Sequence, residues 1–170
     1  MTADQPFAIR LAAEGDADAI AEVHLQSHRE TYLSLVGEQN YWPGGKAERL
    51  AQWQQALAAQ DAGPGIAYVA VVGGRVVGFA HAVGAQITTL YILAAWHRRG
   101  IGRALLTRLC QALAVRGITR ARFAVLAVNS SAIGFYESQG ARQTGVVTVE
   151  EPDLPGLSYQ ERLYEIPTAS

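Results

Sequence analysis

The sequence between Leu90 and Leu106, LYILAAWHRRGIGRALL, constrains the fold of this chain more than any other stretch. An apolar run typical of a buried strand leads into a turn that contains two arginines and two glycines. A helical pattern follows at once, with apolar residues on one face at Ile101, Leu105, Leu106, Leu109 and Leu113. This order suits phosphate binding, because the first amides of a helix have no partners within the helix. Glycine lets a ligand approach the backbone, and arginine supplies charge for phosphate oxygens.

Hydrophobic periodicity and turn residues divide the remaining chain into short elements. Strands are expected over residues 7–11, 66–72, 76–83, 86–93, 120–128, 144–149 and 159–166. Helices are expected from Asp16 onward and over residues 46–60, 101–116 and 132–139. The Gly73-Gly74 pair indicates a β-hairpin, and the long helix before residue 120 indicates a parallel crossover. We therefore predict one α+β domain over residues 1–170, with a mixed, mostly antiparallel sheet of about seven strands flanked by about four helices in a three-layer arrangement.

Composition excludes several functional classes. The chain has 170 residues, 49% of them hydrophobic and 17% charged, which fits one packed domain. A net charge of −1 argues against a nucleic-acid partner. The single cysteine, Cys110, excludes an internal disulfide, offers no metal-site pattern and is expected to be a buried, inert thiol. No apolar run reaches the ~20 residues of a membrane span and no signal peptide is evident, so we expect a cytoplasmic protein without a membrane partner or a metal.

The sequence lacks residues that two common phosphate-binding motifs require. A Walker loop ends in Gly-Lys-Ser/Thr, which is absent here. A dinucleotide fingerprint fits Gly100 and Gly102, but Leu105 occupies the position of the third glycine. The following strand, over residues 120–128, also lacks the acidic residue that would bind a ribose. An unrelated nucleotide-binding domain is therefore a weakened alternative, and another phosphate-containing ligand is favoured.

Two motifs resemble those of the GCN5-related N-acetyltransferases, abbreviated GNAT. Residues 97–102, His-Arg-Arg-Gly-Ile-Gly, are similar to the family's acetyl-CoA motif, Gln/Arg-x-x-Gly-x-Gly/Ala after a strand. Residues 129–140 are similar to a second motif, Asn-x-x-Ala-x-x-Phe-Tyr-Glu-x-x-Gly. The spacing between the motifs and the order of elements also match, so the resemblance covers nearly the whole chain. It implies a GNAT-like fold and an acetyl-CoA-dependent N-acetyltransferase acting by direct attack of a primary amine in a ternary complex.

The resemblance also implies roles for individual residues. The pantetheine arm would pair with the main chain from Leu90 to Ile92, and the pyrophosphate would meet the amides of residues 98–103. Tyr136 would protonate the leaving thiolate, and Asn129 would contact the pantetheine or an ordered water. Alternatively, Tyr136 is a core residue, Asn129 is only a helix cap, and the arginines lie in a solvated turn. The implied cofactor-binding residues are Leu90, Tyr91, Ile92, His97, Arg98, Arg99, Gly100, Ile101, Gly102, Arg103, Asn129 and Tyr136, with Tyr136 and Asn129 as catalytic candidates.

Two positions depart from the family pattern. His97 stands where glutamine or arginine is usual, which changes one side-chain contact and leaves the backbone cradle available. Gln86 stands where many members carry a glutamate that acts as general base, and glutamine cannot accept a proton at neutral pH. The base therefore stays open, with His81 as a candidate by its usual pKa range. An acyl-CoA-binding module without catalytic activity is the alternative function, and Gln86 is its main support.

The acceptor would lie against the first two helices and their connection, near His28 and Tyr32, with Gln86 and His81 as further substrate candidates. The run S-x-R-E-T-Y resembles a widespread bacterial subgroup but names no substrate. A small-molecule amine, an amino-acid-like molecule, a protein N-terminus and a lysine all stay open as acceptors. A homodimer is also possible.

Glu30 and Glu38 are expected on the solvated surface of a helix, and Trp42, Trp53 and Trp96 are expected to pack in the core.

Overall fold

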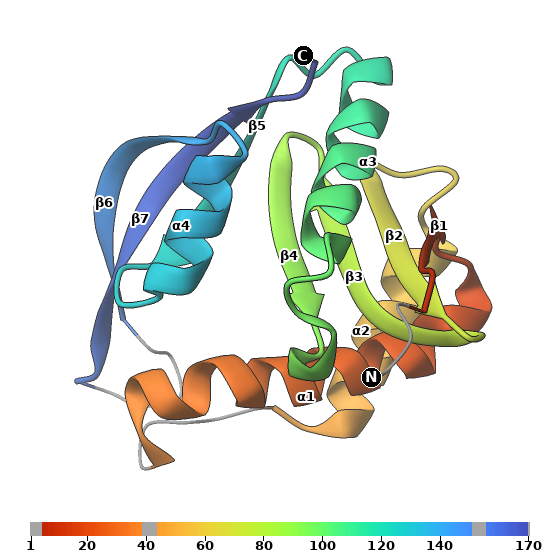
Figure 1. The fold of residues 1–170 in the computed structure, drawn as a ribbon, viewed down its shortest axis with the longest axis horizontal. Coiled ribbons are helices and arrows are strands. Elements are labelled where there is room, and N and C mark those ends of the chain that lie inside the picture. Colours follow the sequence, from red (N-terminus) through yellow and green to blue (C-terminus); the bar gives the residue numbers. More distant parts are fainter. Residues whose placement is uncertain (1–4, 39–43, 151–155, 170) are drawn as a thin grey trace.

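The strands form one sheet that is antiparallel except at one place. A computed structural model describes residues 5–38, 44–150 and 156–169. Within them the sheet has seven strands in the order β1-β2-β3-β4-β5-β7-β6, and only β4 and β5 pair in parallel (Figure 1). The strands are β1 (Ala8–Leu11), β2 (Gly65–Val72), β3 (Arg75–Val83), β4 (Gln86–Ile92), β5 (Arg120–Leu126), β6 (Arg142–Glu150) and β7 (Ser158–Pro167). The predicted mixed, mostly antiparallel sheet is confirmed.

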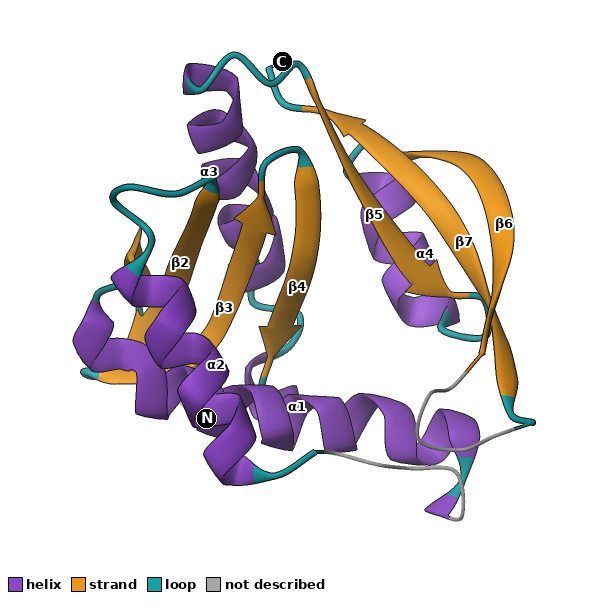
Figure 2. Ribbon diagram, turned by 180° about the vertical axis from the view of Figure 1, so that it is seen from behind, coloured by secondary structure: helices purple, strands orange, loops and turns teal. Residues whose placement is uncertain are grey.

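Helices cover both faces of the sheet and make three layers. The helices α1 (Ala17–Val36) and α2 (Lys46–Ala58) lie behind the sheet in Figure 1 and in front of it in Figure 2. The helices α3 (Ile101–Val115) and α4 (Ser130–Ser138) lie on the opposite face. Each face has its own hydrophobic cluster, one built on α3 with Leu105 and Leu109, the other built on α1 and α2 with Ile20 and Trp53. Successive side chains of a strand point to opposite faces of the sheet, so the strands contribute apolar residues to both clusters.

The central strands β4 and β5 separate soon after they meet. Their pairing is limited to Gln86 opposite Arg122, supported by a hydrogen bond from the Arg122 amide to the Ala85 carbonyl (2.8 Å). Beyond this point the two strands diverge toward α1, as both ribbon views show (Figures 1 and 2). β5 instead pairs along its length with β7. One edge of β4 therefore lacks a neighbouring strand over most of its length.

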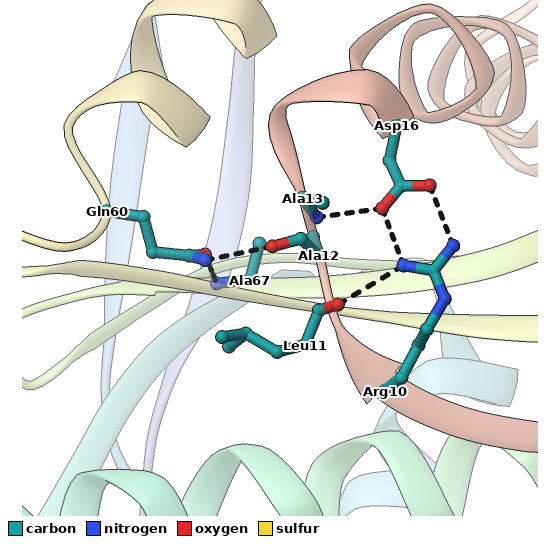
Figure 3. Close-up of polar contacts among 7 residues, drawn as sticks. All are labelled: Arg10, Leu11, Ala12, Ala13, Asp16, Gln60 and Ala67. Carbon is teal, nitrogen blue, oxygen red and sulfur yellow. Dashed lines mark hydrogen bonds and ion pairs between the residues drawn. The ribbon is translucent and has the colours of Figure 1, made fainter.

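Polar contacts attach the α1–α2 layer to the sheet (Figure 3). Asp16 lies at the start of α1, and its carboxylate accepts a hydrogen bond from the Ala13 amide (2.8 Å) and two from Arg10 of β1 (2.6 and 2.8 Å). This ion pair holds the pKa of Asp16 below its usual range. The buried Gln60 side chain, just after α2, donates to the Ala12 carbonyl (3.0 Å) and accepts from the Ala67 amide (2.7 Å). These bonds fix where both helices begin and end relative to the strands.

Most expected elements form within one to three residues of their predicted ends. The predicted hairpin is confirmed: Gly73 and Gly74 both have positive φ angles (54° and 81°), as a two-residue hairpin turn requires. Cys110 is buried, and burial raises the pKa of its thiol to about 11, which agrees with an inert residue. Trp53 is buried and Trp96 is half-buried against the core, whereas Trp42 lies outside the described residues. Among the described residues, no helix combines the length and apolarity needed to cross a bilayer.

Candidate active site

The loop between β4 and α3 leaves backbone amides without partners. It passes through a 3-10 turn (Ala94–Trp96) and then through left-handed backbone at Arg98 (φ 61°) and Gly100 (φ 81°). Gly100 is the N-cap of α3, and no side chain caps this helix. The first amide bonded to the N-cap carbonyl belongs to Ala104 (3.0 Å), so within the described residues the amides of positions 101–103 have no hydrogen-bond partner. Such a helix start, with its partial positive charge, favours an anion.

The two glycines of this loop are required for different reasons. Gly100 has a left-handed backbone that disfavours other residues, and a Cβ built on it meets nothing within 4 Å. A Cβ on Gly102 would lie 3.2 Å from Ile92 Cδ1 and 3.3 Å from Phe135 Cζ. Gly102 therefore permits α3 to approach both β4 and α4, whereas Gly100 keeps the helix start open on its outer side.

The basic residues of the loop are not paired with carboxylates. Within the described residues, Arg98, Arg99 and Arg103 form no ion pair. The Arg99 guanidinium lies 4.6 Å from the centre of the Trp96 ring, which orients it without neutralising its charge. His97 uses Nε2 to donate to the Ile92 carbonyl (2.8 Å) and so ties the loop back to the end of β4. The three guanidinium charges stay available for a ligand.

The exposed edge of β4 lies next to this loop. Leu90, Tyr91 and Ile92 pair with β3 on one side and with no described strand on the other. A β-bulge places Thr88 as an extra residue, because Ile87 pairs with Ala82 while Thr89 pairs with His81. An extended ligand could therefore add to β4 as a further strand and use its main-chain groups.

Asn129 and Tyr136 are both carried by α4. The Asn129 side-chain oxygen accepts from the Ala132 amide (3.2 Å), so the predicted helix-cap role is confirmed. Tyr136 is half-buried, and its ring centre lies 4.3 Å from that of Phe123. Burial raises the pKa of the Tyr136 phenol well above its usual value, and the nearby Tyr32 raises it further. Tyr136 therefore stays protonated at neutral pH and can donate its proton.

Tyr136 belongs to a group of side chains that we name the tyrosine–histidine cluster: Tyr32, Tyr91, Tyr136, His24 and His28. Tyr32 and His28 come from α1, and their ring centres lie 4.5 Å apart. Tyr32 also shares a side-chain hydrogen bond with Tyr91 of β4. His24 stacks on Tyr91 with ring centres 5.1 Å apart. Residues from α1, β4 and α4, distant in sequence, are thus brought together.

The histidines of this cluster are neutral at physiological pH. Burial, and secondarily the positive charge of Arg49, lowers the pKa of His24 to about 3 and that of His28 to about 4. The indole N–H of Trp53 donates to His24 Nδ1 (3.1 Å), which places the proton of the neutral ring on Nε2. An uncharged imidazole can accept a proton, whereas a charged one cannot.

The remaining predicted substrate residues lie outside the cluster. Gln86 is exposed at the start of β4, where that strand meets β5, and its nearest polar contact is the Ile87 carbonyl (3.5 Å). It precedes Tyr91 by five residues, about 16 Å along an extended strand. His81 of β3 contacts Thr88 Oγ1 (2.7 Å) and lies against Trp53, with ring centres 5.2 Å apart. No group of described His, Cys, Asp or Glu side chains could hold a metal ion.

Sequence reasoning missed three residues near this site. His24 was recognised only as part of a helical face, although its four-residue spacing from His28 places both on one side of α1. Arg49 acts on both histidines from α2, a contact that no local pattern reveals. Glu30 is exposed as expected, yet its carboxylate accepts from the Ala94 amide (2.8 Å) and from Gln26 (2.9 Å). Glu30 therefore connects α1 to the turn that follows β4.

Solved structures of similar fold support this description. The PaiA N-acetyltransferase of Thermoplasma acidophilum, in complex with coenzyme A, has a TM-score of 0.76 at 19% identity over 95% of this chain and 99% of that one. YncA of Salmonella typhimurium, with its cofactor acetyl-CoA, has a TM-score of 0.74 at 21% identity over 97% and 95%. The ribosomal-protein-S18-alanine N-acetyltransferase of Escherichia coli has a TM-score of 0.70 at 18% identity over 97% and 96%. These TM-scores establish a shared fold.

Family membership follows from the sequence itself. No functionally curated protein matches the chain. The acetyltransferase (GNAT) family matches residues 22–141, which include β4, the glycine loop, α3 and the α4 motif. With the fold and the loop geometry in agreement, this chain belongs to the acetyltransferase (GNAT) family.

Proposed function

We propose that this chain is an N-acetyltransferase that moves an acetyl group from acetyl-CoA to a primary amine in a ternary complex. The observation that carries the proposal is the position of α3, whose uncapped first turn lies beside the unpaired edge of β4. An acyl-CoA molecule carries a pyrophosphate and an amide-containing arm. The amides of residues 101–103 suit the pyrophosphate, and the main chain of Leu90–Ile92 suits the arm. Arg98, Arg99 and Arg103 add positive charge for the phosphates.

The proposed chemistry uses a few groups of this chain. The amine nitrogen attacks the thioester carbonyl carbon, and a backbone amide near Leu90 or Ile92 stabilises the oxyanion that forms. When the carbon–sulfur bond breaks, Tyr136 gives its proton to the departing sulfur. Asn129 uses its oxygen as a cap, and its amide nitrogen is free to contact the pantetheine arm. The acceptor amine must lose its proton before it attacks, and water receives that proton, because the lowered pKa of His28 makes its imidazole a weak base.

A thiol-release assay with acetyl-CoA and a panel of amines tests the proposal. Acetyl transfer should produce one free coenzyme A thiol for each amide formed. Calorimetry with coenzyme A is run in parallel, because it separates binding from turnover. Tight binding without turnover for any amine would favour the alternative, an acyl-CoA-binding module, and would contradict the enzymatic proposal.

The outer strand β6 suggests that two copies pair. It lies at the edge of the sheet, and three of its valines are exposed: Val146 by 53%, Val147 by 37% and Val149 by 39%. An exposed apolar edge strand is a template for another strand. Antiparallel pairing of two copies about Val146 would place Arg142 of one opposite Glu150 of the other. We therefore propose a homodimer built on β6.

A further inference from the structure

The helix α2 presents a cation to the acceptor side of the site. Lys46, Arg49 and Trp53 follow one another at spacings of three and four residues, so they share one face of α2. Lys46 forms an ion pair with Glu22 of α1 (2.9 Å), and the Trp53 indole donates to His24 of α1 (3.1 Å). Both flanking residues thus contact α1. Arg49, which lies between them, is held against the stretch of α1 that carries the two histidines.

Among the residues that the structure describes, Arg49 has no anionic partner. Its guanidinium lies over Gly44, with Nε 3.4 Å from the position a Cβ would take there, and Nη1 donates to Gln52 (3.1 Å). Within the described residues, no carboxylate pairs with Arg49, whereas Lys46 on the same face is neutralised. Burial and, secondarily, the charge of Arg49 lower the pKa of His24 and His28. Burial raises the pKa of Tyr91, and the charge of Arg49 partly offsets that rise. His24, His28 and Tyr91 are neutral at physiological pH, so they do not neutralise the positive charge of Arg49.

A carboxylate faces the same cluster from the opposite side. Glu161 lies on β7; burial raises the pKa of Tyr32, and the negative charge of Glu161 adds to that rise. On β7 the neighbouring Arg162 and Tyr164 share the other face, where Tyr164 bonds to Glu137 of α4 (2.8 Å). Within the described residues, Glu161 forms no side-chain hydrogen bond or ion pair. In the described part of the chain, Arg49 and Glu161 thus act on the cluster without an ion-pair partner of their own.

We propose that the acceptor is a small amine that also carries a carboxylate, as an amino acid does, with Arg49 binding the carboxylate and Glu161 facing the ammonium group. This inference rests on the proposed acetyl transfer and narrows its acceptor. A planar guanidinium suits a carboxylate because it can donate two parallel hydrogen bonds. A peptide N-terminus or a protein lysine lacks a carboxylate next to its amine and would leave Arg49 unpaired.

The test compares acceptors that differ only in the carboxylate. Each of several amino acids is assayed beside its amide and its decarboxylated amine, by thiol release and by the rise in melting temperature on binding. The amino acid should exceed the other two in kcat/KM by about 10- to 100-fold, the range for a hydrogen bond to a charged group. Equal rates for the three, or a preference for the amine or for a short peptide, would overturn the proposal.

Substitutions test whether Arg49 and Glu161 are responsible for binding the amino acid. Arg49→Gln should remove the preference for the amino acid over the decarboxylated amine, and Arg49→Lys should restore part of it. Lys46→Gln is the matched control, because it removes a paired cation from the same helix face, and it should keep the preference. Glu161→Gln should weaken the binding of the amino acid and of the amine alike. If Arg49→Gln and Lys46→Gln behave alike, the assignment is wrong.

The binding measurement separates this inference from the proposed function. If coenzyme A binds but no amine is acetylated, the enzymatic proposal fails. The carboxylate site is then judged by thermal stabilisation alone. Stabilisation of the wild-type protein by amino acids that is lost in Arg49→Gln supports the site, and its absence in the wild-type protein refutes it.

Discussion

Acidification should destabilise this protein through His24. His24 is 4% exposed, accepts from Trp53 and stacks on Tyr91. Its pKa falls from 6.5 in the unfolded chain to about 3 in the folded one, mainly through burial. The unfolded state therefore binds more protons between these two values, so stability is full above pH 6.5 and declines as pH falls toward 3. At pH 5 the loss relative to pH 7 is about 2 kcal/mol for this residue, because one pKa unit corresponds to about 1.4 kcal/mol.

Urea denaturation at pH 7 and pH 5 measures this loss. His24→Gln is the comparison variant, because glutamine cannot become charged and its carbonyl can accept the Trp53 hydrogen bond. The free energy of unfolding should fall by about 2 kcal/mol more in the wild-type protein than in the variant between the two pH values. The ion-paired carboxylates Asp16 and Glu165 do not interfere, since their lowered pKa values place their contribution at more acidic pH. Equal pH dependence in both proteins would refute the reasoning about His24.

Three further predictions concern α4 and β6. Tyr136→Phe should reduce kcat about 100-fold, the lower range for a lost general acid, while calorimetry shows unchanged affinity for coenzyme A; equal losses of both would contradict the acid role. Asn129→Ser should retain the cap of α4 and its stability but weaken coenzyme A binding, whereas Asn129→Ala should also cost about 1 kcal/mol in unfolding free energy. Val146→Lys should convert a dimer into monomers in analytical ultracentrifugation, because it places two positive charges opposite each other at the proposed two-fold axis; a monomeric wild-type protein would refute that interface.

Local sequence patterns predicted the parts of the site that are built locally. The strand, glycine loop and helix from Leu90 onward are contiguous, so the residue types alone indicated an open helix start. The cap at Asn129 was likewise predictable, since it depends on a backbone amide three residues away. Periodicity also assigned Trp53 to a buried helix face. In each case the interacting groups lie within about one turn or on one element.

The parts that depend on how distant elements cross were not predictable. Periodicity tells which face of a helix is buried but not which residue it meets. The contact between Trp53 and His24, and the position of Arg49 beside both histidines, follow from the crossing of α1 and α2. The ion pair between Asp16 and Arg10 likewise depends on how β1 lies against the start of α1. The separation of β4 from β5 after a single residue pair likewise leaves no signal in either strand.

The central claim is that the open start of α3 binds the pyrophosphate of coenzyme A, and two glycines at opposite ends of this helix test it. Gly100 precedes α3 with φ 81°, Gly117 follows it with φ 80°, and a Cβ built on either meets nothing within 4 Å. Alanine at either position should cost a similar free energy of unfolding, about 1 kcal/mol, because both adopt left-handed backbone.

Calorimetric titration of coenzyme A into the wild-type protein, Gly100→Ala and Gly117→Ala is therefore the most direct measurement. The account predicts that the wild-type protein and Gly117→Ala bind alike, and that Gly100→Ala binds at least about tenfold more weakly, since its methyl group stands where phosphate would approach the amides. No heat of binding in the wild-type protein, or equal affinity in the two variants, would contradict it.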